Sequence, residues 1–117
     1  VLASWDIEVY SQSGKFPLPD NPGDCIIQIA TTFQRYGEPE PYLRTVVALD
    51  TVDDVDGVEI VAVAHEHDVI NCWVELMRRE AADVLIGYNT HQFDWKYIHG
   101  RAQVCVDDDT GEAGHAA

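Results

Sequence analysis

Two groups of residues have types and spacing that could support metal-dependent chemistry. The first is Asp6-Ile7-Glu8, in which one residue separates two carboxylates. On a β-strand, residues two apart project from the same face, so these charges lie close together. That arrangement is unfavourable unless a cation bridges the carboxylates or one is protonated. Hard divalent cations such as Mg²⁺ prefer carboxylate oxygens, which makes the pair a candidate metal site. Ordinary exposed strands also carry this pattern.

The second group is the segment 89–94, Asn-Thr-His-Gln-Phe-Asp, which directly follows Gly87-Tyr88. A short polar side chain such as Asn89 is suited to the turn between a strand and a helix. Asp94 then lies in the first helical turn, where the helix dipole favours a carboxylate. Taken alone, this segment is equally consistent with an ordinary helix start.

Other polar and aromatic residues give weaker signals. His65-Glu66-His67 has no third ligand at a zinc-like spacing and is interpreted as a solvated turn. Trp95 and Tyr97 could stack on bases or pack in the protein. The cations Lys15, Lys96 and Arg101 could contact DNA phosphates, but scattered cations are typical of a surface. The three cysteines, Cys25, Cys72 and Cys105, form no C-x-x-C pair, which favours a reduced intracellular compartment.

Hydrophobic periodicity and breaker residues predict the elements that position these groups. The predicted strands cover 2–10, 25–36, 43–49, 58–64 and 84–88; the predicted helices cover 66–82 and about 93–103. Short connections among the first three strands indicate an antiparallel meander. The apolar 84–88 segment is interpreted as a buried strand. The whole order is typical of an α/β fold with a mixed sheet.

The helix over 66–82 has the clearest pattern, since its apolar residues fall on one stripe. They are Val69, Ile70, Trp73, Leu76 and Met77. We expect Trp73 and Trp5 to lie in the core. From residue 105 to 117 the chain is polar and aperiodic, so we expect one domain over 1–104 and a disordered tail after it.

Composition limits the possible partners. The chain of 117 residues has 21 acidic and 7 basic residues and a net charge of −14. Such a charge repels phosphate backbones and argues against sequence-independent DNA binding by this piece alone. No stretch is long and apolar enough to span a bilayer, so no membrane partner is predicted.

Taken together, the two groups resemble the first and second exonuclease motifs of the family B DNA polymerases. The resemblance rests on Asp6-Ile7-Glu8 and, some eighty residues on, Gly87-Tyr88-Asn89-x-x-x-Phe93-Asp94. Between them, Gly14-x-Phe16-Pro17, Ile26-Ile27-Gln28-Ile29 and the segment 37–41 are similar to the delta-type catalytic subunit. The resemblance covers residues 3–104.

This resemblance implies an RNase H-like fold of the DEDD exonuclease class. It implies that Asp6, Glu8 and Asp94 are catalytic residues and three of four carboxylate ligands for two Mg²⁺ or Mn²⁺ ions. Asn89 and Phe93 would contact the substrate, a 3′ primer end of DNA. Other implied partners are the remainder of the polymerase chain and its accessory subunits, in the nucleus or at a viral replication site.

The family's third motif, a Tyr-x-x-x-Asp on a later helix, has no counterpart here. Four residues after Tyr97 stands Arg101. We therefore expect an exonuclease domain truncated before that motif, weak or inactive alone. Two alternatives are a non-catalytic structural or interaction module derived from such a domain and a stand-alone DEDD-type exonuclease.

Overall fold

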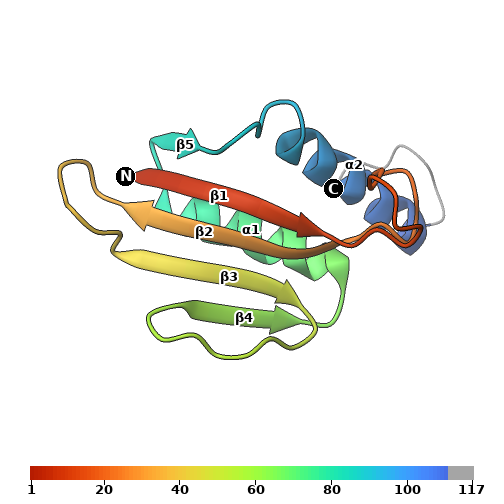
Figure 1. The fold of residues 1–117 in the computed structure, drawn as a ribbon, viewed down its shortest axis with the longest axis horizontal. Helices are drawn as coiled ribbons and strands as arrows, with labels where there is room; N and C mark the ends of the chain where they lie inside the picture. The colour runs from red at the N-terminus through yellow and green to blue at the C-terminus, as the bar shows by residue number, and fades with distance from the viewer. Residues whose placement is uncertain (111–117) are drawn as a thin grey trace.

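The structure, a computed structural model, describes residues 1–110 and the side chains up to Val106. In this part, five strands and two helices form a mixed α/β fold (Figure 1). In chain order they are β1 (Leu2–Val9), β2 (Ile26–Gln34), β3 (Leu43–Leu49), β4 (Glu59–Val63), α1 (Glu66–Glu80), β5 (Val84–Ile86) and α2 (Asp94–Thr110). The predicted α/β class is confirmed, whereas the RNase H-like assignment stays a prediction.

The strands form one sheet in the order β4-β3-β2-β1-β5. The predicted meander is confirmed, because β1, β2 and β3 pair antiparallel in sequence order. The sheet is mixed because β4 runs parallel to β3 and β5 runs parallel to β1. This topology places β1 between β2 and the strand that leads to α2, so its acidic residues lie near the start of that helix.

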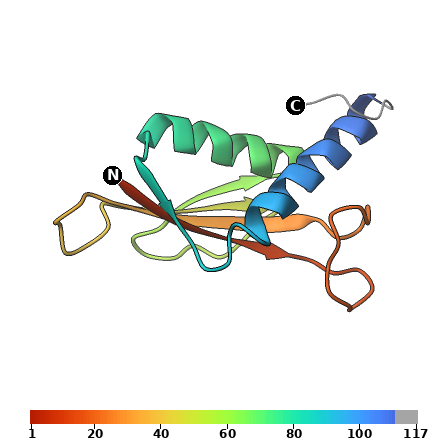
Figure 2. The same ribbon diagram turned by 90° about the horizontal axis from the view of Figure 1, so that it is seen from above.

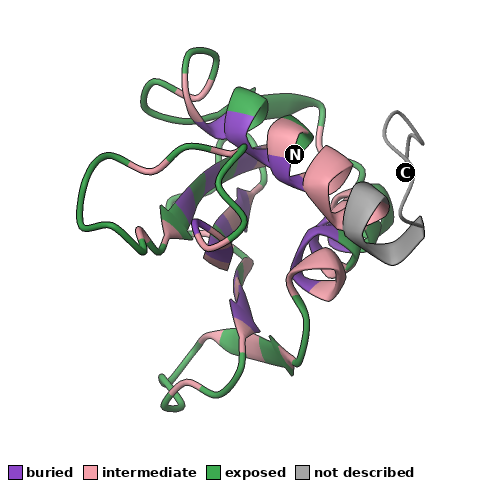
Figure 3. Ribbon diagram, turned by 90° about the vertical axis from the view of Figure 1, so that its right-hand side faces the viewer, coloured by how far each residue is buried: buried purple, intermediate pink, exposed green. Residues whose placement is uncertain are grey.

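The alternation of side chains along β1 gives the sheet two different faces. Ala3, Trp5 and Ile7 are buried, whereas Asp6 and Glu8 are exposed on the opposite face. Both helices lie on the buried side of the sheet (Figure 2). The core therefore lies between the helices and one sheet face, where the buried residues concentrate (Figure 3).

Trp5 and Trp73 lie in this core, and Trp95, which is 39% exposed, packs against both from the surface. The Trp5 ring lies 4.8 Å from that of Trp73 and 4.7 Å from that of Trp95, measured between centroids. The indole of Trp73 also donates a buried hydrogen bond to Thr31 Oγ1 at 3.0 Å, which ties α1 to β2. The predicted core positions of Trp5 and Trp73, and the predicted stripe on α1, are confirmed.

Two element predictions are wrong. The strand β5 is not buried: Val84, Leu85 and Ile86 are 48%, 43% and 45% exposed, because β5 is an edge strand that pairs only with β1. The helix α2 continues past Gln103 to Thr110. Part of the predicted tail is therefore helical, and residues 111–117 lie outside the described residues. Among those described, no helix is long and apolar enough to cross a membrane.

Candidate active site

Asp6 and Asp94 are far apart in the chain, but the fold brings their carboxylates together. The backbone N–H of Ile7 donates to Asp6 Oδ1 at 3.0 Å and to Asp94 Oδ2 at 3.3 Å. One carboxylate comes from the exposed face of β1 and the other from the first residue of α2. The sequence-predicted proximity of these two residues is thus present in the structure.

The environment of Asp94 disfavours its charged form. Its residue surface is only 2% exposed, whereas Asp6 is open to solvent. Burial and the neighbouring Asp6 carboxylate raise the pKa of Asp94, and the hydrogen bond from the Ile7 amide opposes this only in part. None of the salt bridges within the described residues involves Asp6, Glu8 or Asp94. The pair therefore forms a negative site that a cation would stabilise.

A tight turn between β5 and α2 places Asp94. A Cβ at Gly87 would lie 2.0 Å from the Thr90 Cγ2 methyl and 3.2 Å from the Trp5 carbonyl oxygen, so any larger residue would require the Thr90 side chain and the turn to shift. Asn89 has a left-handed backbone with φ of 56°, a conformation that asparagine tolerates better than most residues. Its carbonyl accepts the Phe93 N–H at 3.1 Å. The predicted role of Asn89 in shaping this turn is confirmed.

The carboxylate pair lines a hollow of about 290 Å³. Its walls contain both predicted substrate contacts, Asn89 and Phe93. They also contain two aromatic residues, Phe16 and Tyr88, to which the sequence analysis assigned no role in the site. The ring of Phe16 lies edge-on to that of Phe93, with centroids 5.6 Å apart. Phe16 is 73% exposed and Tyr88 is 95% exposed. This exposure of large aromatic rings marks them as candidates, and it could not be predicted from the local sequence.

A second hollow, of about 520 Å³, continues from the first across the exposed face of the sheet. The two share Asp6 and Tyr88 in their walls. Small and polar residues of β1, β2 and β3 form its floor, including Ser4, Thr32 and Arg44. A ligand in contact with Asp6 therefore has an open path over the sheet.

Glu8 stands apart from the pair. It is exposed on the same face of β1 as Asp6, one residue before a register shift in the β1–β2 pairing. It does not line the hollow that contains Asp6 and Asp94. Within the described residues, no three His, Cys, Asp or Glu side chains are placed to hold a metal ion together. The role of Glu8 as a ligand thus stays a prediction.

Two of the candidate DNA contacts are structural instead. Arg101 is only 2% exposed and ion-paired with Glu66, so it is not a surface cation. Tyr97 is buried and donates to the Asp24 carbonyl at 2.6 Å, which removes its ring from any base. Trp95 packs in the tryptophan cluster with part of its surface exposed. These contacts could not be predicted because they join segments distant in the chain.

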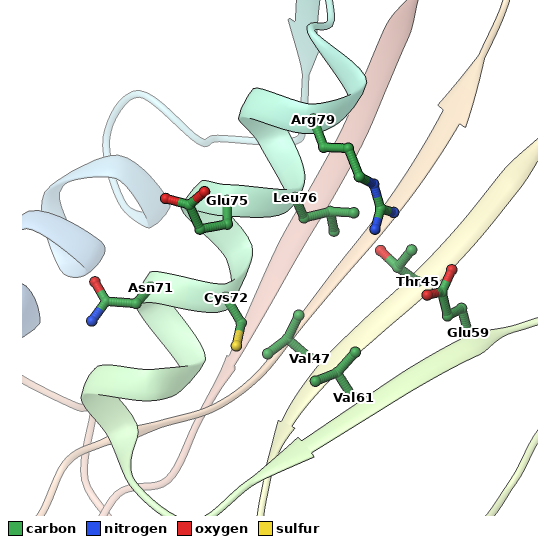
Figure 4. A pocket seen from close by; sticks show the side chains of 9 residues that line it. All are labelled: Thr45, Val47, Glu59, Val61, Asn71, Cys72, Glu75, Leu76 and Arg79. Carbon is green, nitrogen blue, oxygen red and sulfur yellow. The ribbon is translucent and has the colours of Figure 1, made fainter.

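Two other surface features could be considered as sites, but neither contains Asp6, Glu8 or Asp94. His65 stacks on His67, with ring centroids 5.3 Å apart, at the start of α1. A groove of about 560 Å³ lies between α1 and the strands β3 and β4, with Val47, Val61 and Leu76 pointing into it (Figure 4). It opens on the sheet face opposite Asp6. The hollow beside Asp6 is therefore the candidate active site.

Comparisons with known proteins give consistent relatives. The sequence pattern of the family described as DNA polymerase family B, exonuclease domain, matches residues 1–116. The chain is 58% identical over 112 residues to a DNA polymerase of Paramecium bursaria Chlorella virus NY2A, covering 96% of this chain and 12% of that protein. It is 36% identical over 103 residues to the DNA polymerase delta catalytic subunit of Oryza sativa subsp. japonica, covering 88% of this chain and 9% of that protein. It is 37% identical over 102 residues to the delta catalytic subunit of Bos taurus, covering 87% of this chain and 9% of that protein. The chain thus spans about a tenth of these relatives.

Proposed function

The chain belongs to the exonuclease-domain family of the family B DNA polymerases, and we propose that it is the front portion of a proofreading 3′–5′ exonuclease in a DNA-directed DNA polymerase. The proposed reaction is hydrolysis of the 3′-terminal phosphodiester of a DNA primer end. The proposed fold is the RNase H-like fold of the DEDD exonucleases. The single observation that carries the proposal is the contact between the buried Asp94 and Asp6 across the Ile7 amide.

The chemistry of this pair fits a divalent metal ion. Two carboxylates share one donor, and burial together with the Asp6 charge raises the pKa of Asp94. Mg²⁺ and Mn²⁺ prefer such hard oxygen ligands. Asp6 and Asp94 would hold the first metal, and Glu8, on the same face of β1, is the proposed third ligand. In a complete two-metal site, bound ions supply an activated water and stabilise the leaving oxygen.

Residues of this chain would orient the DNA end. Asn89 lines the same hollow as Asp94, and its side-chain amide would donate to a phosphate or a base there. Phe93 and Phe16 form an apolar wall of the hollow, which suits a terminal base or sugar. The second hollow would accept the preceding nucleotides over the sheet.

The charge of the chain bears on its partners. With a net charge of −14, the chain attracts cations and repels bare phosphates, so we expect its DNA contacts to depend on divalent metals. The remainder of the polymerase chain and its accessory subunits are the proposed sources of basic surface. The proposed location is the nucleus or a viral replication site.

One observation favours a second candidate, a non-catalytic structural module of a polymerase. Within the described residues, no group of three ligands is placed to hold a metal ion. A module of this kind would retain the fold and the Asp6–Asp94 contact without hydrolysis.

A chimeric polymerase tests the proposal and separates the two candidates. This chain would replace the matching segment of the chlorella virus relative, and the assay would follow a 5′-labelled primer with a mismatched 3′ end in Mg²⁺. We expect digestion, and a loss of roughly a hundredfold or more in the Asp6→Ala/Glu8→Ala variant. The matched control is Asp53→Ala/Asp54→Ala, which removes two exposed carboxylates elsewhere.

Two outcomes would contradict the proposal. Equal digestion by the Asp6→Ala/Glu8→Ala variant would remove the site assignment. A folded but inactive chimera, beside an active relative, would favour the non-catalytic module.

A further inference from the structure

We propose that Arg101 is a positioning residue of this site, which holds the segment between β1 and β2 so that Phe16 closes the hollow around Asp6 and Asp94. The inference rests on the proposed function, because it concerns the wall of the same hollow. Arg101 lies on α2, about two turns after Asp94. It is 2% exposed, so it is part of the interior.

Every N–H of the Arg101 guanidinium has a partner. Two bonds form a fork with the Glu66 carboxylate, from Nε at 2.8 Å and from Nη2 at 2.6 Å. The other three N–H groups donate to backbone carbonyls of the segment between β1 and β2, residues 10–25. These carbonyls belong to Asn21 at 2.8 Å, Pro19 at 3.0 Å and Pro22 at 3.3 Å. A guanidinium has five N–H donors in a fixed planar arrangement, and all five are used here. A lysine has three donors and no fork, so it cannot replace this pattern.

The same face of α2 holds the segment at two further points. The Tyr97 hydroxyl, one helical turn before Arg101, donates to the Asp24 carbonyl at 2.6 Å. Gly100 packs against the Pro19 ring so closely that an added Cβ would approach it to 2.7 Å. The helix that begins with Asp94 therefore also fixes the course of the β1–β2 segment.

The segment itself is drawn together by the Asp24 carboxylate, which is buried. It accepts hydrogen bonds from the backbone N–H of Gln12 at 2.9 Å and of Leu18 at 3.1 Å. Phe16 lies between these two residues and is itself 73% exposed. Its contact with Phe93 thus depends on how the segment is anchored, and Arg101 provides most of the bonds from α2.

This geometry distinguishes positioning from a direct charge effect. The saturated and buried guanidinium has no free N–H for a phosphate. Arg101→Lys keeps the positive charge but loses the fork and two donors. We therefore expect this variant to release the β1–β2 segment even though its charge is unchanged. The matched control is Arg78→Lys on the exposed surface of α1, where the arginine pairs with Glu75 alone among the described residues.

Limited proteolysis of the 117-residue chain with trypsin tests the anchoring directly. Lys15 lies in the segment, and Arg35, in the exposed turn after β2, is a reference site for loosening of the chain away from the segment. We expect Arg101→Lys to speed cleavage after Lys15 by about tenfold or more, with less than about a twofold change after Arg35. We expect Arg78→Lys to change neither rate. Tyr97→Phe, which removes a single hydrogen bond, should give a smaller rise at Lys15 in a chain that stays folded.

Cleavage after Lys15 at the wild-type rate in both Arg101→Lys and Tyr97→Phe would overturn the proposal. An equal rise at Lys15 and Arg35 in both variants would also overturn it, since the role would then be general stability.

Kinetics of the chimeric polymerase test the link to the site. We expect Arg101→Lys to raise the KM for a single-stranded 3′ end by about tenfold, with an unchanged Mn²⁺ concentration for half-maximal activity, because Asp6 and Asp94 remain in place. A released segment with an unchanged KM would overturn the positioning role. Failure of the proposed function itself would appear differently, as an inactive wild-type chimera with the proteolysis pattern intact.

Discussion

At the scale of single residues, the most unusual feature is a carboxylate buried beside another carboxylate. Asp94 is 2% exposed, and its partner in the Ile7 amide contact is Asp6. Folded proteins seldom retain such a pair unless it has a function, because burial and like charge both oppose ionisation. The pair therefore carries a cost in stability that metal binding would offset.

This cost gives a prediction for the metal-free chain. Asp94→Asn keeps an oxygen acceptor for the Ile7 amide but removes the buried charge. We expect its Tm at neutral pH, in the presence of a chelator, to rise by about 2–4 °C, measured by circular dichroism. Asp53→Asn, an exposed control, should change the Tm by less than about 1 °C. A fall in Tm for Asp94→Asn would mean that the carboxylate stabilises the metal-free fold.

Asp24 gives a prediction for pH. Its hydrogen bonds from the Gln12 and Leu18 amides lower the pKa of this carboxyl below its usual range. A carboxyl with a lowered pKa in the folded state contributes stability above its unfolded pKa and loses it as the pH falls through the folded value. We expect the Tm to drop between about pH 5 and pH 3, and to drop less steeply in Asp24→Asn. Parallel curves for the two proteins would show that this carboxyl does not drive the acid transition.

At the scale of elements, the packing of α1 on the sheet combines apolar contact with one buried hydrogen bond. Trp5 and Trp73 are each 3% exposed and their rings are in contact. They differ in one respect. The Trp73 indole N–H is bonded to Thr31, whereas the Trp5 indole N–H has no hydrogen-bond partner within the described residues.

This difference makes the two tryptophans a matched pair. Replacement by Phe removes a similar apolar area at each site, but only Trp73→Phe also breaks a buried hydrogen bond. We expect Trp73→Phe to lower the free energy of unfolding by about 1 kcal/mol more than Trp5→Phe does. Urea unfolding followed by circular dichroism measures both values. Equal losses would mean that the bond to Thr31 adds no net stability.

Several elements, and part of the site, were predictable from the sequence. Period-two and period-3.6 patterns identify the strands and α1, and strand alternation places Asp6 on the exposed face of β1. The long end of α2 was missed because its last turns are polar, and the exposure of β5 was missed because an apolar run does not reveal an edge position. The buried role of Arg101 was missed because its partners are distant in the chain: Glu66 lies 35 residues away, and the carbonyls of Pro19 and Asn21 lie 82 and 80 residues away.

At the scale of the whole molecule, negative charge is the dominant property. The net charge of −14 on 117 residues produces self-repulsion that counterions screen. We expect the Tm to rise by about 3–5 °C between 20 and 300 mM NaCl, measured by thermal denaturation in a chelating buffer. A neutral solute added at the same osmolarity as the NaCl should not reproduce the rise in Tm that occurs at the lower salt concentrations. A Tm independent of salt would mean that the charges are already compensated locally.

The same charge complicates any test of metal binding, because acidic surfaces attract divalent cations without a site. We propose a more specific effect, namely that Asp6 and Asp94 form a site in which Mn²⁺ relieves the repulsion between the two carboxylates. A matched comparison separates the two cases. Asp6→Asn/Asp94→Asn and Asp53→Asn/Asp54→Asn each remove two carboxylates, the first pair from the site and the second from an exposed turn.

The most direct measurement is therefore Mn²⁺ binding to the 117-residue chain by isothermal titration calorimetry, for the wild type and these two variants. We predict saturable binding with a Kd below roughly 1 mM, retained in Asp53→Asn/Asp54→Asn and lost in Asp6→Asn/Asp94→Asn. Equal, weak binding by all three folded proteins would contradict the account, since the carboxylates of the hollow would then be no more than part of a generally acidic surface.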